Sequence, residues 1–341
     1  MSCQSLRRKR GDTKTICKVC GLSMQLDSSS PERQKPNLEN AFGNLRASES
    51  LESQCRLCCA NHRPYLADRF LVQCDDCQLV FEHPRPSDQK IRTFYSQSSL
   101  WTCSKDAEGK PRSYIQEISE KKIFFKDLAQ RIKKHKTAGY LLDIGCGPGL
   151  LELELDRSKW KVTGIENASF IADYGRQHLG TSIVNVDFEK SNLPEAHFDV
   201  IVMKYVLDHM EKPFEVLKKA RKLIKPDGIL VLADLINVDS FCARFFKKGH
   251  RLFHPMHFTY FSPKTISYHL NRANFKVNRI EFPYWNTCYF TALNIMKLIY
   301  RIGERFWNDF FSDGNKPIYS VPFYGSMMDV WASPTEAESK I

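Results

Sequence analysis

Three glycines at alternate positions in the middle of the chain form the first candidate site. Residues 141–144 are mainly apolar and include Asp143, and Gly145, Gly147 and Gly149 follow, just before a helical pattern. This order predicts a buried strand, a tight turn and the start of a helix. Glycines let the backbone turn sharply and let a ligand lie against it. The alternative is a glycine turn that only lets a strand and a helix pack closely.

Acidic residues end the next two predicted strands. Glu166 lies 23 residues beyond Asp143, where a carboxylate can accept hydrogen bonds from both hydroxyls of a ribose. Asp187 ends the third strand, where it or its backbone neighbour would reach an adenine edge, with Phe188 beside the ring. These positions fit a cofactor that contains adenosine, and they suit NAD and S-adenosylmethionine equally well.

Histidines near the same strand ends are candidates for proton transfer. His209 follows the apolar strand 198–203, and His254 and His257 lie in the aromatic-rich segment 253–261. Imidazole gains and loses a proton near neutral pH, so His209 and His257 are our candidate catalytic bases. Histidines that only cap a turn or pack against aromatic rings are the alternative.

Two cysteine pairs upstream have the spacing of a metal site. Cys55 and Cys58 are followed, after fifteen residues, by Cys74 and Cys77. Four thiolates at this spacing suit a tetrahedral zinc ion, and because they leave no open position the zinc would be structural. A segment this short buries little core, so zinc would supply much of its folding energy. A further pair, Cys17 and Cys20, resembles half of such a site.

The candidate cofactor residues require an alternating fold to bring them together. From residue 139 the chain alternates apolar strand patterns with helical patterns, which predicts a parallel sheet with helices on both faces, a doubly wound α/β fold. Ligands of such sheets bind at the carboxyl ends of the strands. The expected strands are 140–144, 162–165, 182–186, 198–203 and 229–233, and the expected helices include 169–178 and 213–223.

The rest of the chain divides by composition. We expect residues 1–50 to be a disordered basic tail, 51–86 the zinc-binding knuckle unit, 87–138 a helical connector, and 139–335 the main domain. Within that domain, the aromatic segment 284–311 predicts a helical insertion. It would be a lid over the acceptor, a surface helix that meets lipid or a partner, or a core helix.

Charge and cysteine content limit the kinds of partner. The 341 residues carry a net charge of +11, which suits an anionic partner: a small-molecule acceptor such as a nucleotide-linked substrate first, with a nucleic acid or an acidic membrane as other candidates and a basic, merely soluble surface as the alternative. No secretory signal or long apolar run is apparent, so we expect no transmembrane segment and a cytoplasmic protein in which the twelve cysteines stay reduced. The sequence does not indicate an oligomeric state.

Taken in order, these motifs resemble the class I S-adenosylmethionine-dependent methyltransferases over residues 140–281. The resemblance implies a Rossmann-like, mainly parallel seven-stranded sheet whose last strand, 327–332, is antiparallel. It also implies that Gly145, Gly147 and Gly149 approach the amino-acid part of the cofactor. The resemblance rests on Leu142–Gly149, Gly164–Glu166, Val186–Phe188, Phe198–Ile201, Val206–His209 and Leu223–Gly228.

A narrower resemblance includes both ends of the domain. The four-cysteine unit, followed by Leu79–Phe81 and Pro84–Pro86, is similar to the zinc-bearing N-terminus of bacterial sugar and natural-product methyltransferases, as is 253–263. That group usually has glycine where this chain has Gln78. The resemblance implies methyl transfer from S-adenosylmethionine to a sugar or glycoconjugate precursor. A zinc-headed RNA methyltransferase and a non-catalytic S-adenosylmethionine-binding scaffold remain as alternatives.

Overall fold

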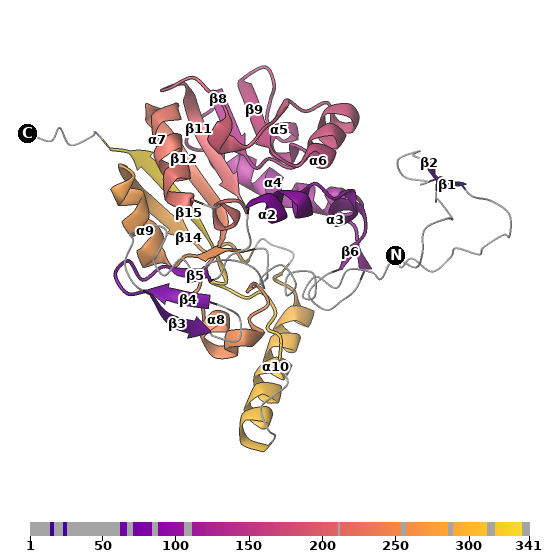
Figure 1. Ribbon diagram of the computed structural model, residues 1–341, viewed down its shortest axis with the longest axis vertical. Helices are drawn as coiled ribbons and strands as arrows, with labels where there is room; N and C mark the ends of the chain where they lie inside the picture. Colours follow the sequence, from indigo (N-terminus) through magenta and orange to yellow (C-terminus); the bar gives the residue numbers. More distant parts are fainter. Residues whose placement is uncertain are drawn as a thin grey trace, which may run out of the picture. The chain divides into compact units, whose positions relative to one another are not determined.

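The computed structural model describes two units of the chain separately. Its described residues are 14–16, 23–25, 62–66, 71–83, 88–105, 111–210, 212–253, 257–285, 289–311 and 318–335. In the first unit, Met1–Asn37, strands β1 (Lys14–Ile16) and β2 (Ser23–Gln25) pair in antiparallel fashion. All other described elements belong to the second unit, Leu38–Ile341 (Figure 1). Cys17, Cys20, Cys55, Cys58 and His254 lie outside the described residues.

Seven of the described strands form one sheet in the second unit. Its order is β10-β9-β8-β11-β12-β15-β14, and the first five strands run parallel while β15 is antiparallel to both neighbours. The predicted mainly parallel, Rossmann-like sheet is therefore confirmed. Its strands are β8 (Gly139–Ile144), β9 (Trp160–Glu166), β10 (Ile183–Asn185), β11 (Phe198–Lys204), β12 (Ile224–Ile236), β14 (Phe275–Glu281) and β15 (Met327–Pro334).

Helices cover both faces of this sheet because successive side chains of its strands point to opposite faces. Leu142 packs in one core cluster with α7 (Pro213–Leu223) and α9 (Pro263–Arg272). Its neighbour Leu141 packs in the other with α4 (Ile118–Lys133) and α5 (Leu150–Leu153). In Figure 1, α7 and α4 accordingly lie on different sides of the sheet.

Several predicted boundaries differ from the observed ones. The strand expected over 229–233 is longer, because β12 begins at Ile224 and includes residues 225–228 as a bulge, where the register with β11 shifts between Phe198 and Val200. The helix expected over 169–178 is α6 (Ser169–Tyr174), which continues as one π-helical turn to Leu179.

The predicted connector contains more than helices. It consists of α2 (Asp88–Tyr95), α3 (Ser98–Thr102), a short hairpin of β6 (Ser104–Lys105) and β7 (Pro111–Arg112), and α4. Its helix α3 packs near α6, so the connector passes close to the carboxyl ends of the parallel strands, where the glycine turn lies. Among the described residues, no helix is both long and apolar enough to cross a membrane.

A second, four-stranded sheet joins distant parts of the chain. Its order is β13-β5-β4-β3, all antiparallel, with β3 (His62–Leu66), β4 (Leu71–Cys74) and β5 (Val80–Glu82) from the cysteine-bearing segment. The fourth strand, β13 (Thr259–Tyr260), comes from the main domain. The small sheet therefore holds residues near 80 against residues near 260.

The turn between β4 and β5 has the backbone of a cysteine knuckle. The N–H of Cys77 points at the sulfur of Cys74, 3.4 Å away, and the N–H of Cys74 donates to the carbonyl of Leu79 at 2.9 Å. Gln78 adopts a φ of +60°, the left-handed conformation for which glycine is preferred. Its side-chain amide donates to the carbonyl of Asp75 at 2.8 Å, so glutamine closes the same turn with a local hydrogen bond.

Candidate functional site

The three predicted glycines form the turn after β8, and all have positive φ: +68° at Gly145, +55° at Gly147 and +81° at Gly149. A Cβ on Gly145 would lie 2.4 Å from Val206, and one on Gly149 would lie 2.7 Å from Thr181. These two glycines are thus required for close packing. A Cβ on Gly147 would meet only the hydroxyl of Tyr114, at 3.7 Å, so Gly147 is the glycine with room for a ligand against its backbone.

Glu166 lies at the carboxyl end of β9, beside this turn. Its carboxylate accepts a hydrogen bond from the N–H of Gly147 at 3.0 Å and another from the N–H of Ala168 at 2.8 Å. Burial raises the pKa of Glu166, and these backbone donors oppose the rise. The structure therefore brings the predicted ribose-binding acid to the predicted cofactor loop.

Asp143 adds a second buried carboxyl to the same place. Its side chain is 3% exposed, and burial, together with the charge of Glu166, raises its pKa to about 8. Two acids buried side by side favour a cationic ligand, because a nearby positive charge stabilises both ionised forms. A sulfonium cofactor has such a charge.

Asp187 and Phe188 lie at the end of β10, as predicted, but their side chains differ in position. The carboxylate of Asp187 is near Asn167, whose amide nitrogen is 3.5 Å away. The ring of Phe188 is 3% exposed, packs in the core and has the ammonium of Lys219 4.8 Å from its centre. The ring of Phe188 therefore lies in the hydrophobic core. The sequence had led us to expect it beside the adenine of a cofactor.

His209 and His257 come together around a buried carboxyl. Asp208, in the short helix η4 (Leu207–His209) after β11, is fully buried, and its Oδ2 lies 3.3 Å from His257 Nε2 and 4.0 Å from His209 Nε2. The two imidazole centres are 4.5 Å apart. Burial raises the pKa of Asp208, and the charge of His209 opposes the rise. Residues 48 positions apart in sequence thus form one cluster, which we call the histidine cluster.

Backbone hydrogen bonds hold the two halves of the histidine cluster in place. The N–H of Phe258 donates to the carbonyl of Asp208 at 2.9 Å, and the carbonyl of Phe258 accepts from the N–H of Glu82 at 2.9 Å. Residues 257–260 are therefore fixed on one side to η4 and on the other to β5. The cluster also adjoins the glycine turn, because Val206, which would meet a Cβ on Gly145, comes three residues before His209.

Sequence reasoning missed two tyrosines of the connector. The hydroxyl of Tyr95, the last residue of α2, lies 3.0 Å from His209 Nδ1 in a hydrogen bond. Tyr114 approaches Gly147 and packs edge-on against Trp101, with ring centres 5.3 Å apart. Burial raises the pKa of Tyr114 above its usual range, so it is neutral at physiological pH. No motif marks either residue, because both reach the site only through the path of the connector.

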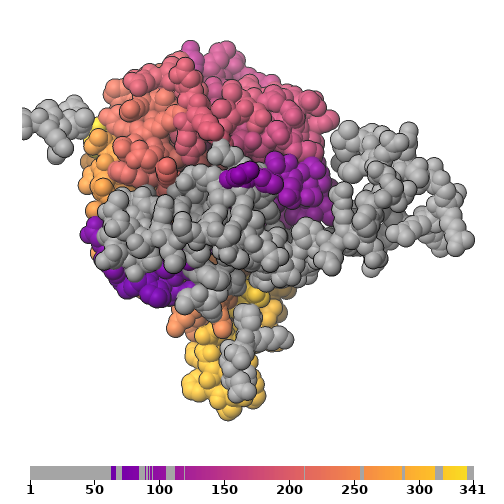
Figure 2. Space-filling model, in the orientation of Figure 1, coloured from indigo at the N-terminus to yellow at the C-terminus, as the bar shows by residue number. Residues whose placement is uncertain are grey.

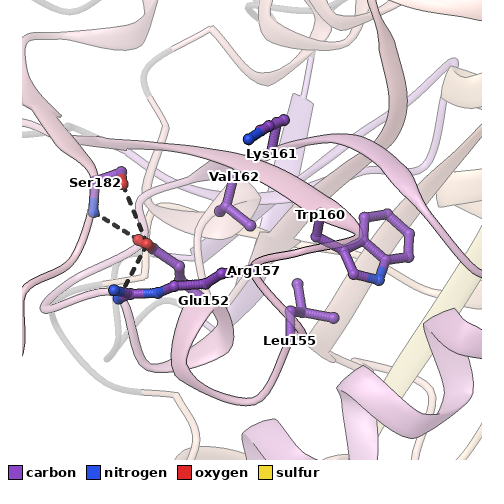
Figure 3. A pocket seen from close by; sticks show the side chains of 7 residues that line it. All are labelled: Glu152, Leu155, Arg157, Trp160, Lys161, Val162 and Ser182. Carbon is purple, nitrogen blue, oxygen red and sulfur yellow. Dashed lines mark hydrogen bonds and ion pairs between the residues drawn. The ribbon is translucent and has the colours of Figure 1, made fainter.

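The pocket in Figure 3 is separate from these residues. It lies at the amino-terminal end of β9, where Trp160, Lys161 and Val162 form part of its lining, whereas Glu166 ends the same strand. Its acid, Glu152, accepts from the N–H of Ser182 at 2.6 Å and pairs with Arg157 at 3.3 Å. Because this carboxylate is already occupied, the pocket offers little chemistry of its own.

Comparison with known proteins supports the resemblance to methyltransferases. Residues 115–280 match a family model described as a methyltransferase domain. A ubiquinone biosynthesis O-methyltransferase of Actinobacillus pleuropneumoniae is 28% identical over 105 residues, which cover 28% of this chain and 45% of that protein. One from Coxiella burnetii is 28% identical over 101 residues, 28% of this chain and 43% of that protein. The chain thus spans under half the length of these relatives.

Solved structures with a similar arrangement include methyltransferases of low sequence identity. A 1,6-didemethyltoxoflavin-N1-methyltransferase of Burkholderia thailandensis, with bound S-adenosylhomocysteine, has a TM-score of 0.46 and 13% identity, covering 77% of this chain and 98% of that one. A possible histamine N-methyltransferase of Thermotoga maritima has a TM-score of 0.43 and 17% identity, covering 64% and 93%.

Gly147→Ala tests whether a ligand lies against the glycine turn. The substitution adds backbone strain of about 1–2 kcal/mol, as does Gly180→Ala at a φ of +64° with nothing within 4 Å. We expect both variants to lose similar thermal stability. Only Gly147→Ala should weaken binding of S-adenosylmethionine, by about tenfold or more, in isothermal titration calorimetry. Equal affinities in the two variants would contradict this role.

The raised pKa of Asp143 predicts proton release on cofactor binding. With a pKa of about 8, the carboxyl is mostly protonated at pH 7 in the ligand-free protein. A cationic cofactor lowers that pKa, so a proton is released near pH 7 and none is released near pH 5 if Asp143 stays protonated in both states there. Calorimetry at pH 7 in buffers of different ionisation enthalpy measures this release, and Asp143→Asn should remove it. A buffer-independent binding enthalpy would count against the prediction.

Proposed function

We propose that this chain, whose residues 115–280 match the methyltransferase-domain model, transfers a methyl group from S-adenosylmethionine to a hydroxyl of a small molecule. The observation that carries the proposal is the histidine cluster beside the glycine turn, which joins a base to a cofactor loop. The names of the curated relatives, O-methyltransferases, support oxygen as the acceptor atom.

In this proposal the glycine turn and the two buried acids hold the cofactor. The backbone at Gly147 lies along its amino-acid part, Glu166 accepts hydrogen bonds from the ribose, and Asp143 supplies negative potential. When bound, S-adenosylmethionine provides an electrophilic methyl group with a neutral leaving group. The chain then needs to align the acceptor and manage its proton.

The histidine cluster performs the proton transfer. His209 Nε2 takes the proton of the acceptor hydroxyl, and Tyr95, bonded to Nδ1 at 3.0 Å, fixes the orientation of the ring. Asp208 then stabilises the positive charge of the protonated imidazole, since its Oδ2 lies 4.0 Å from His209 Nε2 and 3.3 Å from His257 Nε2. A positioned base of this kind contributes about 10²–10⁴-fold to the rate.

For the acceptor we propose a sugar or glycoconjugate precursor. The support is the resemblance of the cysteine knuckle and of 253–263 to the corresponding segments of sugar and natural-product methyltransferases. The excess of basic residues, a net charge of +11, suits an acceptor that carries phosphate or another acid.

Labelled S-adenosylmethionine and fractionated cell extract test the function. We expect label in a small, hydroxyl-bearing acceptor, and label in RNA, or in no fraction at all, would overturn the proposal.

His209→Gln and His257→Gln should each lower kcat by about 10²-fold or more without changing the affinity for the cofactor. His178→Gln, at an exposed histidine of the π-helical turn, is the matched control and should keep wild-type kcat. A wild-type kcat in both His209→Gln and His257→Gln would exclude these histidines as the catalytic base.

The same chain is proposed to bind one structural zinc ion through Cys55, Cys58, Cys74 and Cys77. The described half of the set fits this role: Cys74 is fully buried, Cys77 is 6% exposed, and a backbone N–H points at the sulfur of Cys74. Zinc would hold the small sheet on which residues 257–260 rest.

Metal content and stability together test the zinc site. Elemental analysis should find one zinc per chain in the wild type and less than a tenth of that in Cys74→Ser. Chelator treatment should lower the melting temperature of the wild type. Cys74→Ser should have a similarly lowered melting temperature without chelator. Cys103→Ser, at an exposed cysteine in the connector, is the control that should leave both unchanged. A metal-free wild type with an unaltered melting temperature would exclude the site.

A further inference from the structure

Helix α10 (Ala292–Phe311) presents an apolar face to solvent. Large apolar side chains recur at helical spacing and are strongly exposed: Leu293 (59%), Met296 (65%), Tyr300 (67%), Trp307 (64%) and Phe310 (76%). Within this fully described helix only Leu298 is buried. A continuous exposed face of this size normally marks a contact surface, because a soluble protein seldom leaves it in water.

The opposite side of α10 fixes it to the body of the unit. Leu298 and Ile302 pack in a small cluster with Cys242 and Phe246 of α8 (Phe241–Phe246), and Phe306 lies 5.6 Å from the ring of Phe245. Figures 1 and 2 show the helix projecting from the end of the unit at which α8 lies. The exposed face is therefore separate from the packing face, and α10 is not a core helix.

Basic residues accompany this apolar face. Residues 239–251, which include α8 and the turn η5 (Lys247–Gly249), hold four basic side chains and one acid, and α10 holds three basic side chains and two acids. Phe241 of α8 is also 49% exposed, which adds an aromatic ring on the basic side. Aromatic rings with flanking lysine and arginine are the composition of surfaces that lie at the bilayer interface.

We propose that α10, together with α8 and η5, docks on a bilayer that contains anionic lipid, with α10 lying in the plane of the interface. Charge decides between this occupant and a second copy of the chain. A second copy would bring the same excess of basic residues to the contact, whereas anionic head groups complement it. Twenty residues of helix extend about 30 Å along such a surface.

Co-sedimentation with vesicles tests the proposal, with the full chain and in 0.1 M salt. Vesicles of phosphatidylcholine with 30% phosphatidylglycerol should bind the wild type at least tenfold more tightly than pure phosphatidylcholine does. The double variant Trp307→Ser, Phe310→Ser should lose at least tenfold in affinity for the anionic vesicles. Lys247→Glu, Lys248→Glu should lose the preference for anionic lipid.

Tyr268→Ser removes an exposed aromatic ring, 42% exposed, from α9, outside the proposed surface, and should bind vesicles as the wild type does. Affinity for S-adenosylmethionine and the melting temperature, measured for every variant, show that the substitutions act at the surface. Failure of the wild type to bind anionic vesicles would overturn the proposal, as would wild-type binding by the double variant. A dimer in light scattering that Trp307→Ser, Phe310→Ser disperses, without vesicle binding, would instead assign the face to a second copy.

Discussion

Two backbone hydrogen bonds of Phe258 hold the histidine cluster together. The N–H of Phe258 donates to the carbonyl of Asp208, and the carbonyl of Phe258 accepts from the N–H of Glu82, so this one residue joins η4 to the small sheet. Because His257 immediately precedes Phe258 and His209 immediately follows Asp208, these hydrogen bonds keep the main chain at the two histidines close together. The histidine cluster is thus a consequence of main-chain geometry, which side-chain substitution changes little.

This arrangement gives the cysteine-bearing segment a role in the proposed reaction. Its strand β4 pairs with β5, and β5 pairs with β13, which follows His257 closely in the chain. A metal that rigidifies the knuckle would therefore narrow the range of positions open to His257. Positioning of this kind matters because a displacement of about 1 Å can reduce a reaction rate by about 10²-fold.

Local sequence patterns predicted the strands of the main sheet and α7 well, because apolar runs and a proline start are properties of short segments. They also brought Asp143, Glu166 and the glycine turn together, since the carboxyl ends of parallel strands meet at one edge. The positions of Tyr95 and Tyr114 in the site could not be predicted from local patterns. The connector that carries them has no repeating pattern that would indicate its path across the domain. The burial of Phe188 could not be read locally either, because its ring packs in the core cluster that contains α7, whose Lys219 lies over the ring from 31 residues away.

The position of β15 has a consequence for how the protein forms. Among the described strands this one comes last in the chain, yet it lies between β12 and β14, and β14 reaches the sheet only through it. During synthesis the edge of β12 stays open until residues 327–334 have left the ribosome, and until then Trp331 cannot enter the core where it is fully buried. The nascent chain therefore carries an unpaired, apolar sheet edge, which is the stage at which it depends most on protection from aggregation.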